Sequence, residues 1–573
     1  MSILILYGSE TGTAQDIAES LRREAQMRHL AARVFELDEY DIGQLFTENV
    51  VLFVVSTTGQ GEMPPNMRKT WKLLLRKSLG SEFLKNVNTA VLGLGDSSYQ
   101  KYNFAGKKLY RRLAQMGANM MCGVSLADDQ HEIGIDGAFI PWKQRVWEEI
   151  QRLGIYESMT EEIDPKVKIQ TKYRFVEAGN PDHRKNVVAE SDTGYHALKV
   201  NSNRRVTSEN HFQDTRLVNF EIPYELQSQM KYSPGDVLMV RPYNPDETVQ
   251  VAIEALGYSD EIMNKPVRIV KNDPYSKQPP YFLVGVETTL RTCLQRYFDL
   301  QQIPKRSFFE MLSYYSNDAS EKERLRELAS PEGLDDLLDY ANRCRRTTAE
   351  TFRDFPATSK HLEPDYLFEI LTVIRPRAFS IASAPSANFV ELLVAKVEYK
   401  SRMADKRRGL CSTFISRLKE GDEVFCKIRA GTFKFPLPEA PVICIGPGTG
   451  VAPFRSLFGQ RSRLSPHSSG LLFFGCRGEH DDFYFSDEWN SMSGVEVIAA
   501  FSRDSEKKVY VQHKMGERAR DIKKMLESGA SVFIAGSSGD MPKAVSSVLS
   551  QIQGDEWTKK AEETGRIQYE TWS

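Results

Sequence analysis

The sequence predicts a multidomain α/β protein, in which a doubly wound domain is followed by a β-barrel interrupted by helices and by a second α/β domain. Short apolar strand patterns alternate with helical patterns at both ends of the chain. Between these ends, strand-like alternation of apolar and polar residues flanks a central segment of helical patterns. The length of 573 residues suits three or four domains, each able to bury its own core.

The first predicted domain covers residues 1–148 and the segment 149–194 is expected to be a linker. Near-continuous apolar runs at 3–7, 50–56 and 89–95 are typical of parallel strands buried on both faces. A helical pattern such as that at 14–28 follows each of them, which favours a doubly wound sheet. The expected linker is charged and lacks apolar periodicity over 157–190.

The remaining chain divides into a predicted barrel domain at 195–436 and a final domain at 437–573. Alternating strand patterns occur on both sides of a helical insert at about 246–371. From 437 onward, apolar strands again alternate with helices, as in PVICIG, GLLFFGC, VEVIAAFS and SVFIAGS. This alternation predicts a second α/β domain, of the Rossmann type.

Composition narrows the function classes. The formal net charge is -2, and no basic stripe is present, so we expect no nucleic-acid partner. The 7 cysteines form no CxxC pair, which indicates neither a metal site nor a disulfide framework. The N-terminus begins directly with an apolar strand and shows no leader, so we expect a soluble cytoplasmic protein without a membrane anchor.

Three loops follow predicted strands in the first domain. SETGTA at 9–14 lies between a strand and a helix, where hydroxyls and backbone N–H groups can cradle a phosphate. It lacks GK[ST] and so is not an ATP-type P-loop; taken alone, a simple capped turn explains it equally well. STTGQGEMPPN at 56–66 and LGLGDSSYQKYN at 92–103 also follow strand ends, where open α/β sheets bind ligands. Tyr99 supplies an aromatic face for a flat ring.

Together these three loops resemble the FMN site of flavodoxin and of the diflavin reductases. The resemblance implies that the first loop holds the FMN phosphate, that the other two line the ring and that Asp129 closes the site. Thr58 stands where relatives often carry a tyrosine. The implied FMN residues are Ser9, Glu10, Thr11, Gly12, Thr13, Ala14, Thr57, Thr58, Gly59, Gln60, Leu94, Gly95, Asp96, Ser97, Ser98, Tyr99, Gln100, Lys101, Tyr102, Asn103 and Asp129.

An acidic group lies nearby, at Asp128, Asp129, Glu132 and Asp136. It either guides a partner protein or is a solvated loop, and the sequence does not decide between these interpretations.

Two motifs of the second domain indicate a pyrophosphate site. RPRAFSIAS at 375–383 places an arginine two residues before an aromatic and a serine, and GLCST at 409–413 opens a helix. The pair resembles the FAD site of ferredoxin–NADP reductases, with Phe in place of the usual Tyr, and Arg345 matches a family arginine near FAD. The implied FAD residues are Arg345, Arg377, Ala378, Phe379, Ser380, Gly409, Leu410, Cys411 and Ser412.

In the last domain, GPGTGVAPFRS at 446–456 follows a strand directly, and its glycines let the backbone approach a pyrophosphate. Farther along, a serine, an arginine and a lysine suit a dianionic 2′-phosphate and therefore NADPH, the alternative being a charged surface loop. Both motifs match the NADPH domain of the diflavin reductases. The implied residues are Thr449, Ser502, Arg503, Lys508, Val509, Tyr510, Val511 and Gln512.

The chain ends in ETWS, and on its own this reads as a free tail. In the diflavin reductases a terminal aromatic stacks on the FAD ring, which implies this role for Trp572. The resemblance also makes Ser380 and Glu570 the polar groups near flavin N5, acting as orienting groups. The family's cysteine at this site is replaced by Ala535.

The resemblance covers nearly the whole chain and implies electron flow from NADPH through FAD and FMN to a protein. It is closest to the diflavin reductases of cytosolic iron–sulfur protein assembly, so the implied acceptor is an anamorsin-type iron–sulfur protein. Two alternatives stay open. One is a reductase for a haem or cobalamin protein, of the methionine synthase reductase type, and the other is a non-catalytic binding scaffold.

Overall fold

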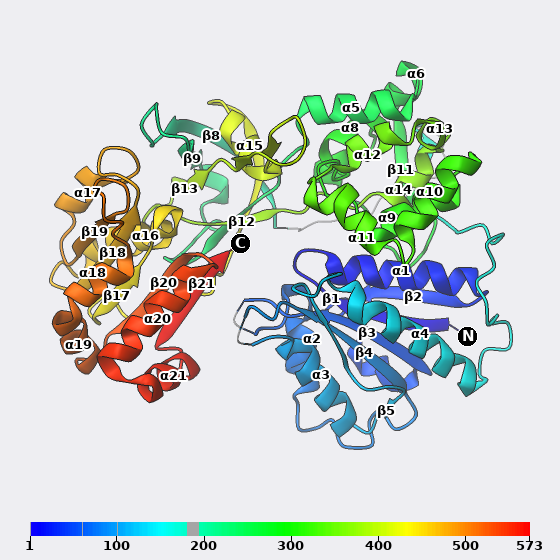
Figure 1. The fold of residues 1–573 in the computed structure, drawn as a ribbon, viewed down its shortest axis with the longest axis horizontal. Coiled ribbons are helices and arrows are strands. Elements are labelled where there is room, and N and C mark those ends of the chain that lie inside the picture. Colours follow the sequence, from blue (N-terminus) through cyan, green and yellow to red (C-terminus); the bar gives the residue numbers. More distant parts are fainter. Residues whose placement is uncertain (1, 60, 100, 180–193, 573) are drawn as a thin grey trace. The chain divides into compact units, whose positions relative to one another are not determined.

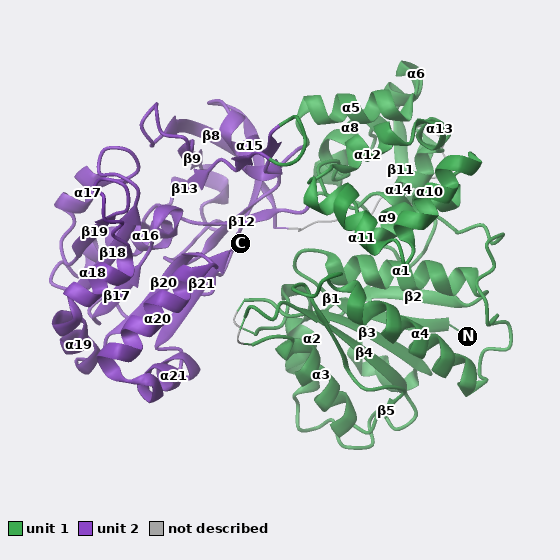
Figure 2. Cartoon of the chain, viewed as in Figure 1, with its two compact units in different colours: residues 1–190, 244–374, 401–405 green, residues 191–243, 375–400, 406–573 purple. Residues whose placement is uncertain are grey.

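The structure is a computed structural model that describes residues 2–59, 61–99, 101–179 and 194–572. Two compact units divide the chain (Figure 2). Unit 1 contains residues 1–190, 244–374 and 401–405, and unit 2 contains residues 191–243, 375–400 and 406–573. Each unit therefore combines segments that are distant in the sequence, and the helical insert belongs to the same unit as the N-terminal domain.

The N-terminal part of unit 1 is a parallel sheet in the order β2-β1-β3-β4-β5, with β6 also pairing with β4 (Figure 1). Its strands are β1 (Ser2–Gly8), β2 (Ala31–Glu36), β3 (Val50–Ser56), β4 (Asn88–Gly95), β5 (Asn119–Met120) and β6 (Ser125–Asp128). Its helices are α1 (Thr13–Met27), α2 (Arg68–Leu74), α3 (Phe104–Gln115) and α4 (Asp136–Leu153). The predicted doubly wound domain is confirmed.

Alternate residues of these strands pack into two separate cores. Side chains of α1 and α4 cover one face of the sheet, and those of α2 and α3 cover the other. This two-sided burial explains the continuous apolar runs, because a strand covered on both faces has no solvated side to carry polar residues.

Unit 1 also contains the insert, which is mainly helical as predicted. It contains α5 (Asp246–Leu256), α6 (Asp260–Asn264), α7 (Tyr281–Val284), α8 (Leu290–Arg296), α9 (Arg306–Tyr315), α10 (Ala319–Ala329), α11 (Leu334–Leu337), a π-helix (Leu338–Arg343), α12 (Thr348–Asp354), α13 (Pro356–Ser359) and α14 (Leu367–Ile370). The segment expected to be a linker carries a strand of its own, β7 (Tyr173–Glu177), which pairs antiparallel with β11 (Val267–Lys271) of the insert.

Unit 2 begins with an antiparallel sheet in the order β12-β10-β16-β8-β9-β13. Its strands are β8 (His196–Arg205), β9 (Thr215–Glu221), β10 (Val237–Val240), β12 (Arg377–Ser380), β13 (Phe389–Ala395) and β16 (Glu423–Arg429). An isolated bridge between Ile381 and Leu392 links the end of β12 to β13. The strands enclose one apolar core, but the described ladders form an open six-stranded path rather than a closed barrel.

A second parallel sheet of unit 2 has the order β19-β18-β17-β20-β21. Its strands are β17 (Val442–Ile445), β18 (Gly470–Cys476), β19 (Glu496–Phe501), β20 (Ser531–Ser537) and β21 (Ile567–Trp572). The accompanying helices are α16 (Ala452–Leu464), α17 (Ser486–Ser491), α18 (Val511–Glu517), α19 (Ala519–Glu527), α20 (Asp540–Gln553) and α21 (Asp555–Glu563). The predicted Rossmann-like domain is confirmed.

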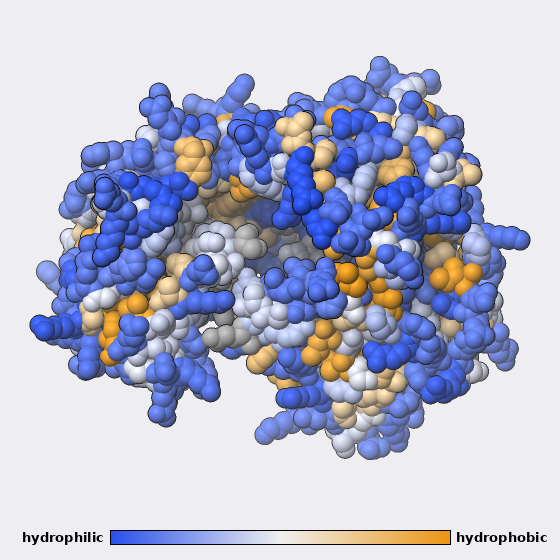
Figure 3. All heavy atoms as spheres, viewed as in Figure 1, coloured by the Kyte–Doolittle hydropathy of each residue, from blue (hydrophilic) through white to orange (hydrophobic). Residues whose placement is uncertain are grey.

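The surface drawn in Figure 3 is dominated by hydrophilic residues, with apolar residues scattered among them. Within the part of the chain that the structure describes, no helix is both long and apolar enough to cross a membrane.

Candidate nucleotide sites

The phosphate loop of the first site is a tight turn between β1 and α1. The Ser9 hydroxyl accepts a hydrogen bond from the backbone N–H of Gly12 at 2.9 Å, and the Ser9 N–H donates to Asn66 Oδ1 at 2.8 Å. Gly12 adopts a φ of 97°, a left-handed conformation that glycine takes without strain. The turn therefore aims the first N–H groups of α1 and their dipole at the loop, as an anion requires.

The second loop is a small hairpin. Thr58 and Glu62 exchange backbone hydrogen bonds of 3.0 and 2.8 Å, and Gly59 and Gly61 both have positive φ. A Cβ on Gly61 would lie 2.6 Å from the Cβ of Lys101, so glycine at this position lets the second and third loops pack together.

The third loop is held by the acidic residues at the end of β6, Asp128 and Asp129. Asp128 Oδ1 accepts hydrogen bonds from the backbone N–H groups of Ser97 and Gln130, and the Asp129 N–H donates to the Gly95 carbonyl. Burial, reinforced by the nearby charge of Asp96, raises the pKa of Asp129. The predicted closing residue therefore does lie beside the third loop.

The structure thus brings the three predicted loops to the carboxyl edge of one parallel sheet, the edge at which open α/β sheets bind their ligands. Gln60 and Gln100, which were also predicted, lie outside the described residues.

The acidic group is only partly available to a partner. Asp136 forms an ion pair with Arg306, whose Nε lies 3.3 Å from Asp136 Oδ1, and Asp128 binds the third loop. Asp129 and Glu132 are both exposed. Structural contacts thus engage Asp128 and Asp136, and the choice between a group that guides a partner and a solvated loop stays open.

A polar triad occupies the predicted flavin end of unit 2. The Ser380 hydroxyl donates to Glu570 Oε1 at 2.6 Å, and the Thr432 hydroxyl donates to Glu570 Oε2 at 3.1 Å. Burial raises the pKa of Glu570, and the two hydroxyl hydrogen bonds oppose that shift. Sequence reasoning missed Thr432, because nothing in its local sequence marks a contact with a residue 138 positions away.

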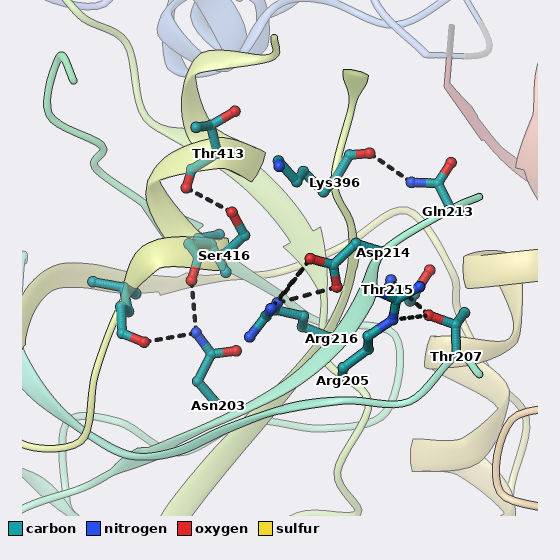
Figure 4. Close-up of polar contacts among 12 residues, drawn as sticks. Asn203, Arg205, Thr207, Gln213, Asp214, Thr215, Arg216, Lys396, Thr413 and Ser416 are labelled. Atoms are coloured by element: carbon teal, nitrogen blue, oxygen red, sulfur yellow. Dashed lines mark hydrogen bonds and ion pairs between the residues drawn. The ribbon is translucent and has the colours of Figure 1, made fainter. Parts of the chain in front are cut away.

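The helix predicted to face the FAD pyrophosphate, α15 (Leu410–Arg417), is fixed to the antiparallel sheet (Figure 4). Asn203 of β8 donates from Nδ2 to the carbonyls of Ile415 and Leu418, both at 2.9 Å, which satisfies two carbonyls at the end of the helix. At its start, a Cβ on Gly409 would lie 2.8 Å from Ser412 Oγ and 3.0 Å from Val397 Cβ, so a larger residue would displace this turn.

The other predicted FAD residues lie on β12 and α15. Arg377 is exposed at the start of β12, and its Nη1 donates to the Arg375 carbonyl, whereas Phe379 packs against the apolar core of the sheet. Arg345 belongs to unit 1, where it has a positive φ of 55°. The FAD residues of unit 2 are thus brought together, and the role of Arg345 stays a prediction.

The glycine-rich loop after β17 approaches a neighbouring strand very closely. A Cβ on Gly450 would lie 2.3 Å from the carbonyl oxygen of Ala535. Only glycine fits such a close approach. The helix α16 begins immediately after this turn, so its N-terminal N–H groups lie at the loop, as a pyrophosphate site requires. Thr449 lies in the same turn.

The residues predicted to bind the 2′-phosphate follow β19. The backbone N–H groups of Ser502 and Arg503 donate to the carbonyls of Cys476 and Arg477, at 3.0 and 2.8 Å. Lys508 is exposed, and Tyr510 caps α18, the helix that begins at Val511. The arginine, the lysine and the serine thus belong to one connection of this sheet, the β19–α18 loop.

The C-terminal strand carries the last predicted residue. Trp572 lies opposite Ser537 at the end of β21, its carbonyl accepts a hydrogen bond from the Ser538 N–H, and 40% of its surface is exposed. Residues up to Trp572 are therefore part of the sheet, and the free-tail alternative is wrong for them.

Three family models match the chain in sequence order. They are Flavodoxin over residues 5–142, FAD binding domain over residues 190–414 and Oxidoreductase NAD-binding domain over residues 444–547. The chain is thus a flavoprotein oxidoreductase that binds FMN, FAD and NADPH, in agreement with the three sites described above.

Full-length relatives narrow the class further. The chain is 39% identical to NADPH-dependent diflavin oxidoreductase 1 of Danio rerio and 38% identical to that of Xenopus laevis, in each case over 100% of the chain and 99% of the relative. The protein of the same name from Arabidopsis thaliana is 35% identical at the same coverage. The chain belongs to the family of NADPH-dependent diflavin oxidoreductases.

Proposed function

We propose that this NADPH-dependent diflavin oxidoreductase delivers electrons from FMN to an anamorsin-type iron–sulfur protein and acts in cytosolic iron–sulfur cluster assembly. This role implies a cytoplasmic location. The observation that carries the proposal is the similarity to the diflavin oxidoreductases along the entire chain, with no module left unmatched.

The flavins supply the chemistry, since FAD accepts a hydride and the flavin pair passes on single electrons. The protein binds, orients and separates the reactants. We assign the 2′-phosphate of NADPH to Ser502, Arg503 and Lys508, because a guanidinium and an ammonium together match a dianion. The FAD pyrophosphate is assigned to Arg377 and the start of α15.

Ser380 and Glu570 are proposed to orient the nicotinamide and the reacting edge of FAD. Their hydrogen bond of 2.6 Å fixes the serine hydroxyl, and Thr432 fixes the other carboxylate oxygen. A hydride passes directly between cofactors, so the residues supply alignment rather than proton transfer. Trp572 is proposed to cover the FAD ring until nicotinamide displaces it.

On the output side, the three loops at the carboxyl edge of the first sheet are proposed to hold FMN. Among the four acidic residues nearby, Asp129 and Glu132 are exposed, and neither side chain forms a hydrogen bond in the described contacts, so these two are best suited to guide a basic acceptor.

Stopped-flow reduction of purified acceptors tests the proposal. The NADPH-reduced protein is expected to reduce an anamorsin-type iron–sulfur protein faster than a haem or cobalamin acceptor at equal concentration. Preferred reduction of a haem or cobalamin protein would instead assign the chain to the methionine synthase reductase type. A purified chain that NADPH does not bleach would be a scaffold.

A further inference from the structure

The predicted phosphate loop has an unfavourable charge of its own. Between Ser9 and Asp16 the chain carries two acidic residues, Glu10 and Asp16, and no basic residue. A phosphate monoester brings a further charge of roughly −1.5 to −2 at neutral pH. Backbone N–H groups and the helix dipole attract this anion, but no cation of the loop balances it.

The balancing cation comes from the helical insert. Lys305 Nζ lies 3.3 Å from Thr13 Oγ1, the hydroxyl at the first position of α1. Lys305 is half-buried, and its charge also acts on Asp129, whose pKa it lowers against the larger effect of burial. The ammonium thus lies beside the first turn of α1, and its charge reaches the residue predicted to close the FMN site. It has three N–H donors, of which the Thr13 contact uses one.

The two residues after Lys305 hold it in this position. The Ser307 hydroxyl lies 2.9 and 3.0 Å from the two carboxylate oxygens of Asp16, in the first turn of α1. Arg306 pairs with Asp136, the first residue of α4. Three consecutive residues of the insert therefore contact the N-terminal turns of two helices of the flavodoxin-like domain, which fixes the ammonium beside Thr13.

We propose that Lys305 is a ligand of the FMN phosphate, supplied to the FMN site by the helical insert. The inference rests on the proposed placement of the phosphate in the loop Ser9–Ala14. Its consequence is that FMN binds most tightly while the flavodoxin-like domain contacts the insert, so that FMN retention and this contact stabilise each other.

Binding of FMN and of riboflavin by the full chain separates a phosphate contact from general destabilisation. FMN is removed while FAD is retained, and each flavin is titrated by quenching of its fluorescence. Lys305→Gln is expected to weaken FMN binding about tenfold, the lower end for a charge-assisted hydrogen bond, and to leave riboflavin binding unchanged. Lys305→Arg is expected to restore most of the FMN affinity.

Lys277→Gln is the matched control, because it removes another lysine of the insert that pairs with the flavodoxin-like domain, at Glu39. It should not change the ratio of FMN to riboflavin affinity. Equal loss of both flavins in Lys305→Gln, or an equal selective loss of FMN in Lys277→Gln, would overturn the inference.

Thr11→Ala separates the role of Lys305 from the placement of the FMN phosphate in the loop Ser9–Ala14. Selective weakening of FMN by Thr11→Ala, with no effect of Lys305→Gln, would leave the phosphate loop in place and refute the role of Lys305. Were neither variant selective for FMN over riboflavin, the placement of the phosphate in this loop would itself be wrong.

Discussion

Arg22 and Glu369 stand 347 positions apart in the sequence and form a buried ion pair within unit 1, with 2.6 Å between Nη2 and Oε2. Arg22 belongs to α1 of the flavodoxin-like domain and Glu369 to α14 of the insert. The second oxygen of Glu369 accepts a hydrogen bond from the backbone N–H of Lys172 at 2.7 Å. One carboxylate thus joins the domain, the connecting segment and the insert.

Loss of this carboxylate should destabilise unit 1. Glu369→Gln removes one of the two carboxylates paired with Arg22 among the described residues and leaves Glu19, and breaking a buried pair costs about 3 kcal/mol. The expected result is a lower urea concentration at the midpoint of FMN release. Lys265→Gln breaks the exposed pair with Glu177 and is expected to leave that midpoint unchanged. Identical midpoints for Glu369→Gln and wild type would show that the pair contributes nothing.

Cofactor selectivity should depend on Arg503. Its backbone N–H donates to the carbonyl of Arg477, the residue after β18, and its Nη1 donates to the Ser502 carbonyl, so the side chain is partly pre-arranged. Arg503→Ala is expected to weaken NADPH binding by roughly 1.5–3 kcal/mol and to change NADH binding little. The measurement is the dissociation constant of each cofactor. A parallel loss for NADH would mean that Arg503 does not bind the 2′-phosphate.

The sequence predicts those features of the fold that leave a pattern among neighbouring residues, such as a buried strand or a glycine-rich turn. The strands at 3–7, 50–56 and 89–95 and the turn at Gly446–Ser456 were predicted because burial and phosphate binding both leave local patterns. The sequence did not predict the contacts of Lys305 with Thr13 and of Thr432 with Glu570, because each contact joins segments that only the tertiary fold brings together. The charged segment 157–190 concealed β7 for a related reason, as its strand is completed by distant β11.

The pH dependence of hydride transfer should report Glu570. Burial raises its pKa above 4.5, and the ionised carboxylate is the form that accepts the Ser380 hydroxyl. The rate is therefore expected to fall as the pH decreases through this raised pKa. Glu570→Gln should abolish that acid limb in the profile of kcat/KM. Thr432→Val removes a hydrogen bond that lowers the pKa and should move the limb to higher pH.

The same residue provides a stability test with a defined sign. Because the folded-state pKa of Glu570 is raised, its contribution to stability is complete below pH 4.5 and is lost as the pH rises through the raised value. The Tm of Glu570→Gln relative to wild type should therefore be higher at neutral pH than at pH 4.5. If the difference in Tm between Glu570→Gln and wild type does not vary with pH, the pKa of the Glu570 carboxyl is not raised in the folded protein.

Trp572 should control access to FAD. Trp572→Ala removes an aromatic stack worth about 0.5–1.5 kcal/mol, which helps nicotinamide reach the ring with or without a 2′-phosphate. Discrimination between NADPH and NADH is expected to fall, chiefly through easier NADH use, in steady-state kinetics with both cofactors. Trp572→Phe, which keeps an aromatic ring, serves as the control. Unchanged selectivity in Trp572→Ala would refute the stacking role.

The FMN site should be the exit for electrons. A cut after residue 148 would divide α4 and remove Arg22, the ion-pair partner of Glu369, so removal of FMN from the full chain is the cleaner test. The FMN-free protein is expected to keep NADPH-dependent ferricyanide reduction at FAD and to lose reduction of the iron–sulfur acceptor. Added FMN should restore it. Full acceptor activity without FMN would exclude the two-flavin order.

The strand β7 has a mechanical consequence for the flavodoxin-like domain. The chain after α4 is bound to that domain at Asp164 and at Gln170, whose N–H groups donate to the Met27 carbonyl and to Gln26 Oε1, and β7 anchors it to the insert from Tyr173. The connection between the two attachments therefore has almost no slack. Even with the Gln170 contact broken, residues 165–172 span at most about 26 Å when fully extended. A connection this short keeps the local concentration of FMN beside the insert high.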